Sequence, residues 1–324
     1  MIFYRLSWII LAHGDCDGIC SASLASSARA DSKLFFSNPY ELLSSLRSIR
    51  GENTIIADIA LVSTYKDQIV NELKRLNSTG EVIYFDHHPL PSGLSESDLP
   101  ATVVRGRDDS CTSELVYEYF KDQLGHEISR VAVYGAIGDY SDNTEAIKEI
   151  LKNWDKRELY LEAGILIAVL EGTKKKDYEF KRGLASYLSR NGLPSLNDDL
   201  VKIAIQESKI DEEMRLVVKR NVRTLGNVAY VQDIPWSLAK SATYARAYGK
   251  AMVGVAAEPM GEYMDMSLRS VDQNNLHQIV PMVAESLNGV GGGHKNAAGA
   301  RVPVGRFMQF ISKLNEAISI QSYP

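Results

Sequence analysis

Short apolar runs and helical stretches alternate along the first half of the chain. The runs SWIILA (7–12), TIIA (54–57) and EVIYF (81–85) have the length and composition of buried strands. Residues 64–77 instead carry apolar side chains at 65, 69, 70, 73 and 76, the spacing of an amphipathic helix. Strands that alternate with helices predict βαβ units and therefore a mostly parallel sheet.

A fourth apolar run, VAVYGAIG (131–138), fits a strand or a buried helix equally, because periodicity does not separate the two in a short segment. Each run is followed by an aspartate or a histidine. Ligands of parallel α/β sheets bind beyond the carboxyl ends of the strands. We therefore expect these acidic and imidazole groups to converge at one edge of the sheet.

The second half of the chain has a different texture. Residues 145–222 are charged and helical in pattern, with a break at Asn191-Gly192-Leu193-Pro194 and a long amphipathic helix predicted over 198–222. Strands are expected at 228–232, 251–258 and 263–270, followed by the glycine-rich segment GVGGGHKNAAGA at 289–300. The length of 324 residues and this change of texture predict two domains.

Composition narrows the class of protein. Hydrophobic residues make up 45% of the chain and charged residues 24%, as in ordinary globular proteins. Three cysteines argue against a disulfide framework and fit a reducing cytoplasm. A net charge of −5 argues against a chain-wide basic surface for duplex DNA, although a local basic channel stays possible. The first apolar run is too short to span a membrane.

His13, Asp15 and Asp17 alternate in the segment HGDCDG. If the strand stays extended there, side chains two residues apart point the same way, so the three can face one site. A helix-capping loop is the alternative, since aspartate and glycine commonly precede helices.

Asp86, His87 and His88 directly follow the third apolar run. Clustered histidines after an aspartate are better explained by metal ligation than as isolated polar groups. Asp58 and Asp139 follow two of the other runs, where each taken alone also fits a helix cap or a turn.

These side chains form one candidate ligand set: His13, Asp15, Asp17, Asp58, Asp86, His87, His88 and Asp139. The set suffices for two metal ions about 3.5–4 Å apart that share a carboxylate and clamp both oxygens of an in-line displacement at phosphorus. One ion would need fewer acidic groups, so the surplus favours two. Imidazole combined with carboxylates suits Mn²⁺.

The motifs resemble those of a known family. HGDCDG, the strand-end Asp58, FDHH and AIGD occur in the order of the four motifs of DHH phosphoesterases, and GGGHKNAAGA resembles the signature of their DHH-associated C-terminal domain. The resemblance runs from about residue 8 to residue 304. It implies an α/β fold with a catalytic domain at 1–190, a helical linker at 191–222 and a smaller substrate-binding α/β domain with a mixed sheet at 223–324. The active site would lie in the cleft between the domains.

The resemblance also implies roles for the candidate residues. His13 and Asp15 would hold one Mn²⁺, and Asp17, His87 and Asp139 would hold the other, with Asp58 as the bridge; Mg²⁺ or Co²⁺ are possible substitutes. Asp86 would ligate a metal or orient a ligand, and His88 would contact the scissile phosphate, which makes these two the candidate catalytic residues. Many members have a glycine two residues after the bridging aspartate, whereas here the run is Asp58-Ile59-Ala60.

The C-terminal domain is predicted to clamp the substrate. Gly291, Gly292 and Gly293 let a backbone approach a phosphate closely and offer N–H groups, and His294 and Lys295 add donor character. Arg269 and Ser270 resemble further phosphate contacts of the family. A charge run from Lys174 to Arg182 is read as a solvated helix face, with contact to nucleic acid as the alternative.

Three functions remain open. The first is a RecJ-like, Mn²⁺-dependent exonuclease for single-stranded DNA or RNA, as in the archaeal RecJ-like proteins. The second is a phosphoesterase for short substrates, namely nano-RNA, 3′-phosphoadenosine 5′-phosphate or cyclic dinucleotides. The third is a non-catalytic replication scaffold, which the filled ligand positions disfavour. A catalytic chain could also dock on replication or repair proteins such as GINS, as a monomer or a homodimer, and no membrane association is expected.

Overall fold

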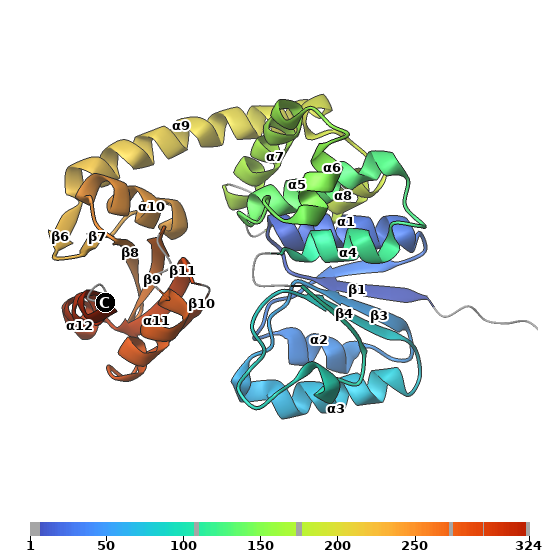
Figure 1. Cartoon of the computed structure of the whole chain (residues 1–324), viewed down its shortest axis with the longest axis horizontal. Helices are drawn as coiled ribbons and strands as arrows, with labels where there is room; N and C mark the ends of the chain where they lie inside the picture. The colour runs from blue at the N-terminus through green and yellow to red at the C-terminus, as the bar shows by residue number, and fades with distance from the viewer. Residues whose placement is uncertain (1–6, 107–109, 173–176, 272–274, 294, 322–324) are drawn as a thin grey trace, which may run out of the picture. The chain divides into compact units, whose positions relative to one another are not determined.

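The computed structural model describes residues 7–106, 110–172, 177–271, 275–293 and 295–321. The chain divides into two compact units, Met1–Glu207 and Ser208–Pro324 (Figure 1). Each unit has its own sheet and its own hydrophobic core.

The described part of the first unit contains a five-stranded sheet in the order β2-β1-β3-β4-β5, and every neighbouring pair is parallel. Its strands are β1 (Trp8–Ala12), β2 (Lys33–Phe36), β3 (Asn53–Ala57), β4 (Val82–Asp86) and β5 (Thr102–Arg105). The three strands predicted from apolar runs are thus present, and the parallel sheet is confirmed.

Helices cover both faces of this sheet, which explains why β1 and β4 are buried along their whole length (Figure 1). On one face lie α2 (Leu42–Ser48) and α3 (Lys66–Asn77), whose leucines and isoleucines pack on alternate strand residues. On the other face lie α1 (Cys16–Ala28) and α4 (Thr112–Phe120).

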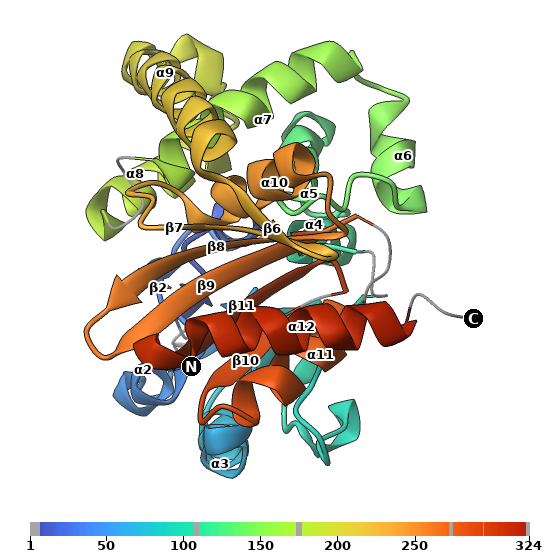
Figure 2. The same cartoon turned by 90° about the vertical axis from the view of Figure 1, so that its left-hand side faces the viewer.

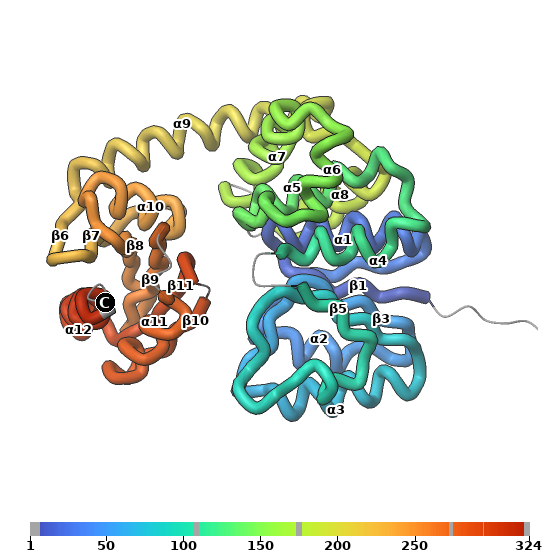
Figure 3. The backbone as a smooth tube through the Cα atoms, in the orientation of Figure 1, coloured from blue at the N-terminus to red at the C-terminus, as the bar shows by residue number. Residues whose placement is uncertain are grey.

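A further helical layer follows along the chain. It contains α5 (Ser129–Gly138), α6 (Glu145–Leu151), α7 (Lys156–Glu171) and α8 (Tyr178–Ser189). The fourth apolar run is therefore a buried helix and not a strand. The predicted long helix is α9 (Asp198–Asn221), which carries the chain from the first unit into the second (Figure 3).

The second unit is built on a mixed sheet, in the order β10-β11-β9-β8-β7-β6 among the described residues. Its strands are β6 (Arg223–Leu225), β7 (Val228–Gln232), β8 (Val253–Met260), β9 (Tyr263–Ser270), β10 (Val290–Gly293) and β11 (Ala297–Pro303). Helix α10 (Leu238–Gly249) lies on one face, and α11 (Leu276–Glu285) and α12 (Phe307–Gln321) lie on the other (Figure 2). The glycine-rich segment contributes the antiparallel pair β10–β11.

None of the described helices combines the length and the apolar character that crossing a membrane requires.

Candidate metal centre and active site

Three strand ends of the first unit meet at one edge of the sheet. His13 follows β1, Asp58 follows β3, and His87 and His88 follow β4. The backbone ties these ends together, because the His13 N–H donates to the Ala57 carbonyl at 3.2 Å and the Asp58 N–H donates to the Phe85 carbonyl at 3.0 Å. The predicted convergence at the carboxyl edge is therefore present for these three strands.

Asp15 and Asp17 reach the site in another way than expected. The chain does not stay extended after His13: it turns, and α1 begins at Cys16 with Asp15 as its N-cap. The Asp15 carboxylate accepts the Gly18 N–H at 3.0 Å, which satisfies an end-of-helix donor. The turn is tight enough that a Cβ at Gly18 would lie 2.3 Å from the His13 carbonyl oxygen. The capping loop and the site are thus the same structure.

Asp139 enters from a helix, because it caps the C-terminal end of α5. Its Oδ2 lies 3.6 Å from His87 Nε2. The sequence left open whether the run before Asp139 is a strand or a helix, and the structure shows that it is the helix α5.

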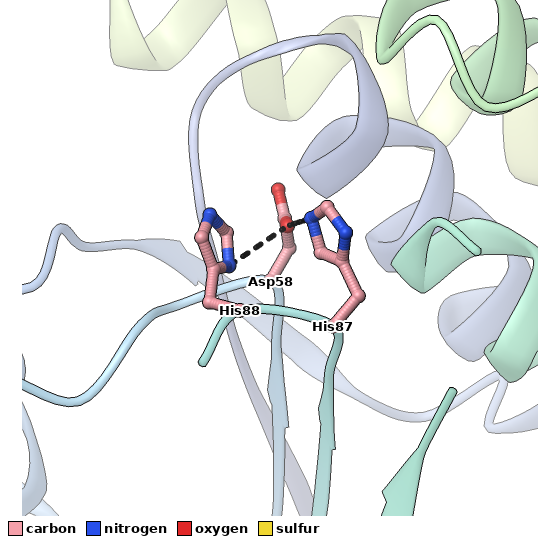
Figure 4. A group of neighbouring side chains, drawn as sticks. All are labelled: Asp58, His87 and His88. Atoms are coloured by element: carbon pink, nitrogen blue, oxygen red, sulfur yellow. Dashed lines mark ion pairs between the residues drawn. The ribbon is translucent and has the colours of Figure 1, made fainter. Parts of the chain in front are cut away.

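The Asp58 carboxylate points between two imidazole rings (Figure 4). Its Oδ1 lies 3.5 Å from His87 Nε2 and 4.0 Å from His88 Nδ1. The backbone of Asp58 has a φ of +61°, in the left-handed region that non-glycine residues rarely adopt. Such strain is retained at functional sites where the surroundings hold it, and here it follows directly on a buried strand.

Seven of the predicted residues form overlapping groups whose ligand atoms lie within 4.8 Å of one another. These groups are His13–Asp15–Asp58, Asp17–His87–Asp139 and Asp58–His87–His88. The first two contain the residues that the resemblance assigns to the two ions, and Asp58 is shared between the first group and the third. The assignment of each residue to an ion stays a prediction.

The donor set fits cations on chemical grounds. Asp58 is 2% exposed, and its Oδ2 has no hydrogen-bond partner among the described residues. Burial and the neighbouring Asp15 and Asp17 carboxylates raise the pKa of Asp58 well above its usual range. Burial and the same two carboxylates raise the pKa of Asp139 to about 8. Asp58 and Asp139 thus resist ionisation in the absence of a cation. Divalent cations would neutralise the negative charge of such a cluster.

Asp17 is held by the first turn of α4, which the sequence analysis did not connect to the site. The N–H groups of Thr112 and Ser113 donate to its two oxygens at 2.7 and 2.9 Å, and the Thr112 hydroxyl donates to Asp58 Oδ1 at 3.2 Å. The Ser and Thr residues before an apolar run signal a helix start in the sequence. Their contact with Asp17, 95 residues away, arises only from the fold.

Asp86 stands apart from the three groups. It is fully buried, and it accepts hydrogen bonds from the Tyr84 hydroxyl at 2.8 Å and from Arg105 at 3.4 Å on Oδ2. Its Oδ1 lies 2.8 Å from His88 Nδ1. Arg105 also donates to the His88 carbonyl. This geometry favours the orienting role over ligation, and it identifies Arg105 and Tyr84 as site residues that sequence reasoning missed.

The position of Lys181 contradicts the prediction for the charge run. The charge run from 174 to 182 was expected to be a solvated helix face, yet Lys181 is 3% exposed. Its ammonium donates to the Gly14 carbonyl, between His13 and Asp15. Residues 174–176 lie outside the described residues.

The predicted substrate contacts of the second unit also lie together. Arg269 pairs with Ala297 in the sheet, and the Ser270 hydroxyl is 3.2 Å from Asn296 Oδ1, so β9 runs beside the β10–β11 connection. The Lys295 carbonyl accepts the Leu276 N–H at the start of α11. His294 lies outside the described residues.

The three glycines of β10 differ in what constrains them. A Cβ at Gly291 would lie 2.9 Å from Val280, and Gly293 has a φ of +142°. A Cβ at Gly292 would meet open space. Packing explains Gly291 and backbone conformation explains Gly293. Neither constraint explains why position 292 is a glycine.

Residues 7–138 match the model of the DHH family N-terminal domain, and residues 228–320 match the model of the DHHA1 domain. The fold, the acidic and imidazole cluster and these matches define a metal-dependent phosphoesterase. The chain belongs to the DHH family, with a DHHA1 domain in its second unit. No curated protein matches the chain.

Solved structures with a similar fold include three proteins of different description. RecJ from Thermus thermophilus, in complex with Mn²⁺, is 16% identical, with a TM-score of 0.68 over 98% of this chain and 52% of RecJ. The pGpG-specific phosphodiesterase PggH from Vibrio cholerae is 13% identical, with a TM-score of 0.60 over 98% of this chain and 99% of PggH. CDC45 from Entamoeba histolytica is 8% identical, with a TM-score of 0.62 over 97% and 95%. The chain thus spans about half the length of that RecJ, and at these identities the likeness concerns the fold.

Proposed function

We propose that the chain is a Mn²⁺-dependent phosphodiesterase that hydrolyses single-stranded DNA or RNA from an end, in the manner of a RecJ-like exonuclease. The observation that carries this proposal is the buried Asp58 carboxylate, which lies among imidazoles and further carboxylates and has one oxygen with no hydrogen-bond partner among the described residues. A pair of divalent cations held by His13, Asp15, Asp17, Asp58, His87 and Asp139 would neutralise phosphate charge and lower the pKa of a water nucleophile.

The protein's own residues position the reacting groups. Asp58 belongs both to the group with His13 and Asp15 and to the group with His87 and His88, which is consistent with its proposed bridging role. Thr112 and Ser113 hold Asp58 and Asp17 through α4, which limits their rotation. Because His88 Nδ1–H is directed at Asp86, the Nε2 atom is the one that can contact a phosphate oxygen.

In the second unit we propose that Arg269, Ser270 and Lys295 bind a phosphate next to the scissile one, with the N–H groups of the 291–293 strand. An arginine guanidinium matches phosphate in two-pronged hydrogen bonding. Among the described residues β10 is an edge strand, so some of its N–H groups are not used by the sheet. His294 belongs to the same proposal by its position in the sequence.

A second candidate is a phosphoesterase for very short substrates, namely nano-RNA, 3′-phosphoadenosine 5′-phosphate or cyclic dinucleotides. One observation favours it: the likeness extends over 99% of PggH, a phosphodiesterase for a dinucleotide, but over 52% of RecJ. The CDC45-like fold keeps open docking on replication proteins such as GINS, in addition to catalysis.

The test is a substrate panel with Mn²⁺, Mg²⁺ or Co²⁺. It contains end-labelled single-stranded DNA and RNA of several lengths, 3′-phosphoadenosine 5′-phosphate and a cyclic dinucleotide. Stepwise shortening of long strands supports the exonuclease, and cleavage confined to short substrates supports the second candidate. If no substrate is cleaved, or if Asp58→Asn cleaves as fast as the parent protein, the catalytic proposal is wrong.

A further inference from the structure

Two aromatic side chains lie beside residues 13–15 of the first unit, the segment between β1 and α1 that carries the predicted ligands His13 and Asp15 and is called the ligand loop below. Phe36 is the last residue of β2, and its partner in the sheet is Ala12 of β1, the residue before His13. The Ser37 N–H donates to the Ala12 carbonyl at 2.9 Å and holds this register. Phe36 therefore lies at the same edge of the sheet as the metal centre.

Tyr178, the first residue of α8, stacks on Phe36. The ring centroids are 6.1 Å apart and the ring planes differ by 19°. Tyr178 also reaches the ligand loop, since its Cε1 lies 3.5 Å from the position that a Cβ on Gly14 would take. Gly14 separates His13 from Asp15, so the tyrosine ring lies beside the residue that joins two predicted ligands.

Lys181 fixes this arrangement from one helical turn away. Its ammonium donates to the Gly14 carbonyl and lies 5.5 Å from the centre of the Tyr178 ring. Since Lys181 is buried, α8 is held against the loop and the position of Tyr178 is set by the fold. Tyr178 itself is 45% exposed, so part of the ordered ring faces solvent next to the metal centre.

A flat, ordered aromatic surface beside a phosphate-hydrolysing site has a natural ligand. Every nucleobase presents a π-face, and stacking on protein aromatics is the sequence-tolerant device by which proteins grip single strands. We propose that the Phe36–Tyr178 pair is a stacking platform for the base of a nucleotide that adjoins the scissile phosphate. The inference rests on the proposed function and deepens it, because it gives the first unit its own contact with the base.

The platform predicts a defined pattern of cleavage. The substrates are end-labelled single strands in which one residue at a time, around the cleaved bond, is replaced by an abasic residue. Cleavage by the parent protein should slow by about 5- to 150-fold at one position only, as expected from about 1–3 kcal/mol of stacking per base. Tyr178→Ala should slow cleavage of the intact strand by a similar factor and remove the discrimination. Tyr178→Phe and Tyr178→Trp should keep both.

A matched control is Tyr263→Ala in the second unit. Tyr263 is 43% exposed, close to Tyr178, and it stands six residues before Arg269 on β9, about 20 Å along the strand. This variant should cleave and discriminate like the parent protein. Thermal unfolding of each variant checks the fold, and Tyr178→Leu, which keeps an apolar contact with Gly14, replaces the alanine variant if the latter unfolds.

A second readout does not depend on cleavage. A strand with 2-aminopurine at the sensitive position should lose fluorescence on mixing with the parent protein, before any product forms, and should not with Tyr178→Ala. Equal cleavage of intact and abasic strands, or unchanged discrimination in Tyr178→Ala, overturns the platform while leaving the phosphodiesterase intact. Quenching that depends on Tyr178 without any cleavage supports the platform and rejects the proposed catalysis.

Discussion

The variant Asp86→Asn tests whether Asp86 orients His88 or binds a metal ion. The Asp86 carboxylate meets donors on both sides: Tyr84 and Arg105 at Oδ2, and His88 Nδ1 at Oδ1. An asparagine keeps one acceptor oxygen and replaces the other with an N–H₂ group. Arg105 can only donate, so the retained oxygen should face Arg105 and the N–H₂ should face His88. His88 Nδ1 must then accept, and the proton of the ring moves to the other nitrogen.

The size of the effect follows from these contacts. Arg105 loses a charged partner at 3.4 Å and keeps Glu96, which is exposed. A hydrogen bond to a charged group contributes about 1.5–3 kcal/mol, so we expect a loss of about 2–4 kcal/mol in the free energy of unfolding. For a domain of about 200 residues this lowers the melting temperature by roughly 5–15 °C. Loss of the residue that orients His88 should reduce kcat/KM by about 10- to 100-fold.

The assays are thermal unfolding, kinetics on a single-stranded oligonucleotide and metal content by mass spectrometry. Asp86→Asn should retain the metal content of the parent protein. Asp155→Asn is the control, because Asp155 is also paired with an arginine but is 47% exposed, and such surface pairs contribute about 0–1 kcal/mol. Loss of a metal equivalent in Asp86→Asn, or unchanged kinetics, would refute the orienting role.

Asp58→Asn removes a buried carboxyl that resists ionisation, so at pH values above about 4 the metal-free variant should be more stable than the metal-free parent protein. The variant should no longer be stabilised by Mn²⁺, and melting with and without the metal tests both expectations. Asp139 should make metal binding depend on pH. With its pKa raised to about 8, the folded protein holds a proton that the unfolded chain releases near pH 4, so metal-free stability should fall as pH rises from about 4 to 8 while apparent Mn²⁺ affinity rises. A flat profile in both melting and calorimetric titration contradicts this. Gly135→Ala should weaken metal binding and cost about 1–3 kcal/mol in stability, because the new Cβ would lie 2.2 Å from Ser113 Oγ and 2.8 Å from Asp17 Oδ1. Gly164→Ala, with open space around it, should have neither effect.

The fold was predictable where local pattern is strong. The apolar runs at 7–12, 54–57 and 81–85 predicted β1, β3 and β4, because these strands lie in a parallel sheet covered on both faces and such strands are continuous apolar runs in sequence. The segment 131–138 was not decidable on the same basis. A helix packed on all sides is apolar all round, so its sequence has no period that separates it from a strand.

The convergence of the candidate ligands was predictable for a similar reason. Acidic and imidazole groups directly after apolar runs are unusual in sequence, and the topology of a parallel sheet brings such positions together. Asp15 and Asp17 nevertheless do not continue the extended strand, as the pattern predicted, because Asp15 caps α1 and Asp17 lies in its first turn. Asp15 in this segment fits a strand end and a helix cap equally, and only the close approach of Gly18 to His13 selects the cap.

The sequence by itself determined which side chains are candidate metal ligands and on which segments they lie, because short-range pattern encodes strands, helices and their ends. Only the tertiary structure decided what holds those side chains: α4 on Asp17, Arg105 and Tyr84 on Asp86, and α8 with Lys181 and Tyr178 on the ligand loop. These contacts join residues that are mostly far apart in the chain. Their formation depends on which surfaces pack together, and no local period or motif carries that information.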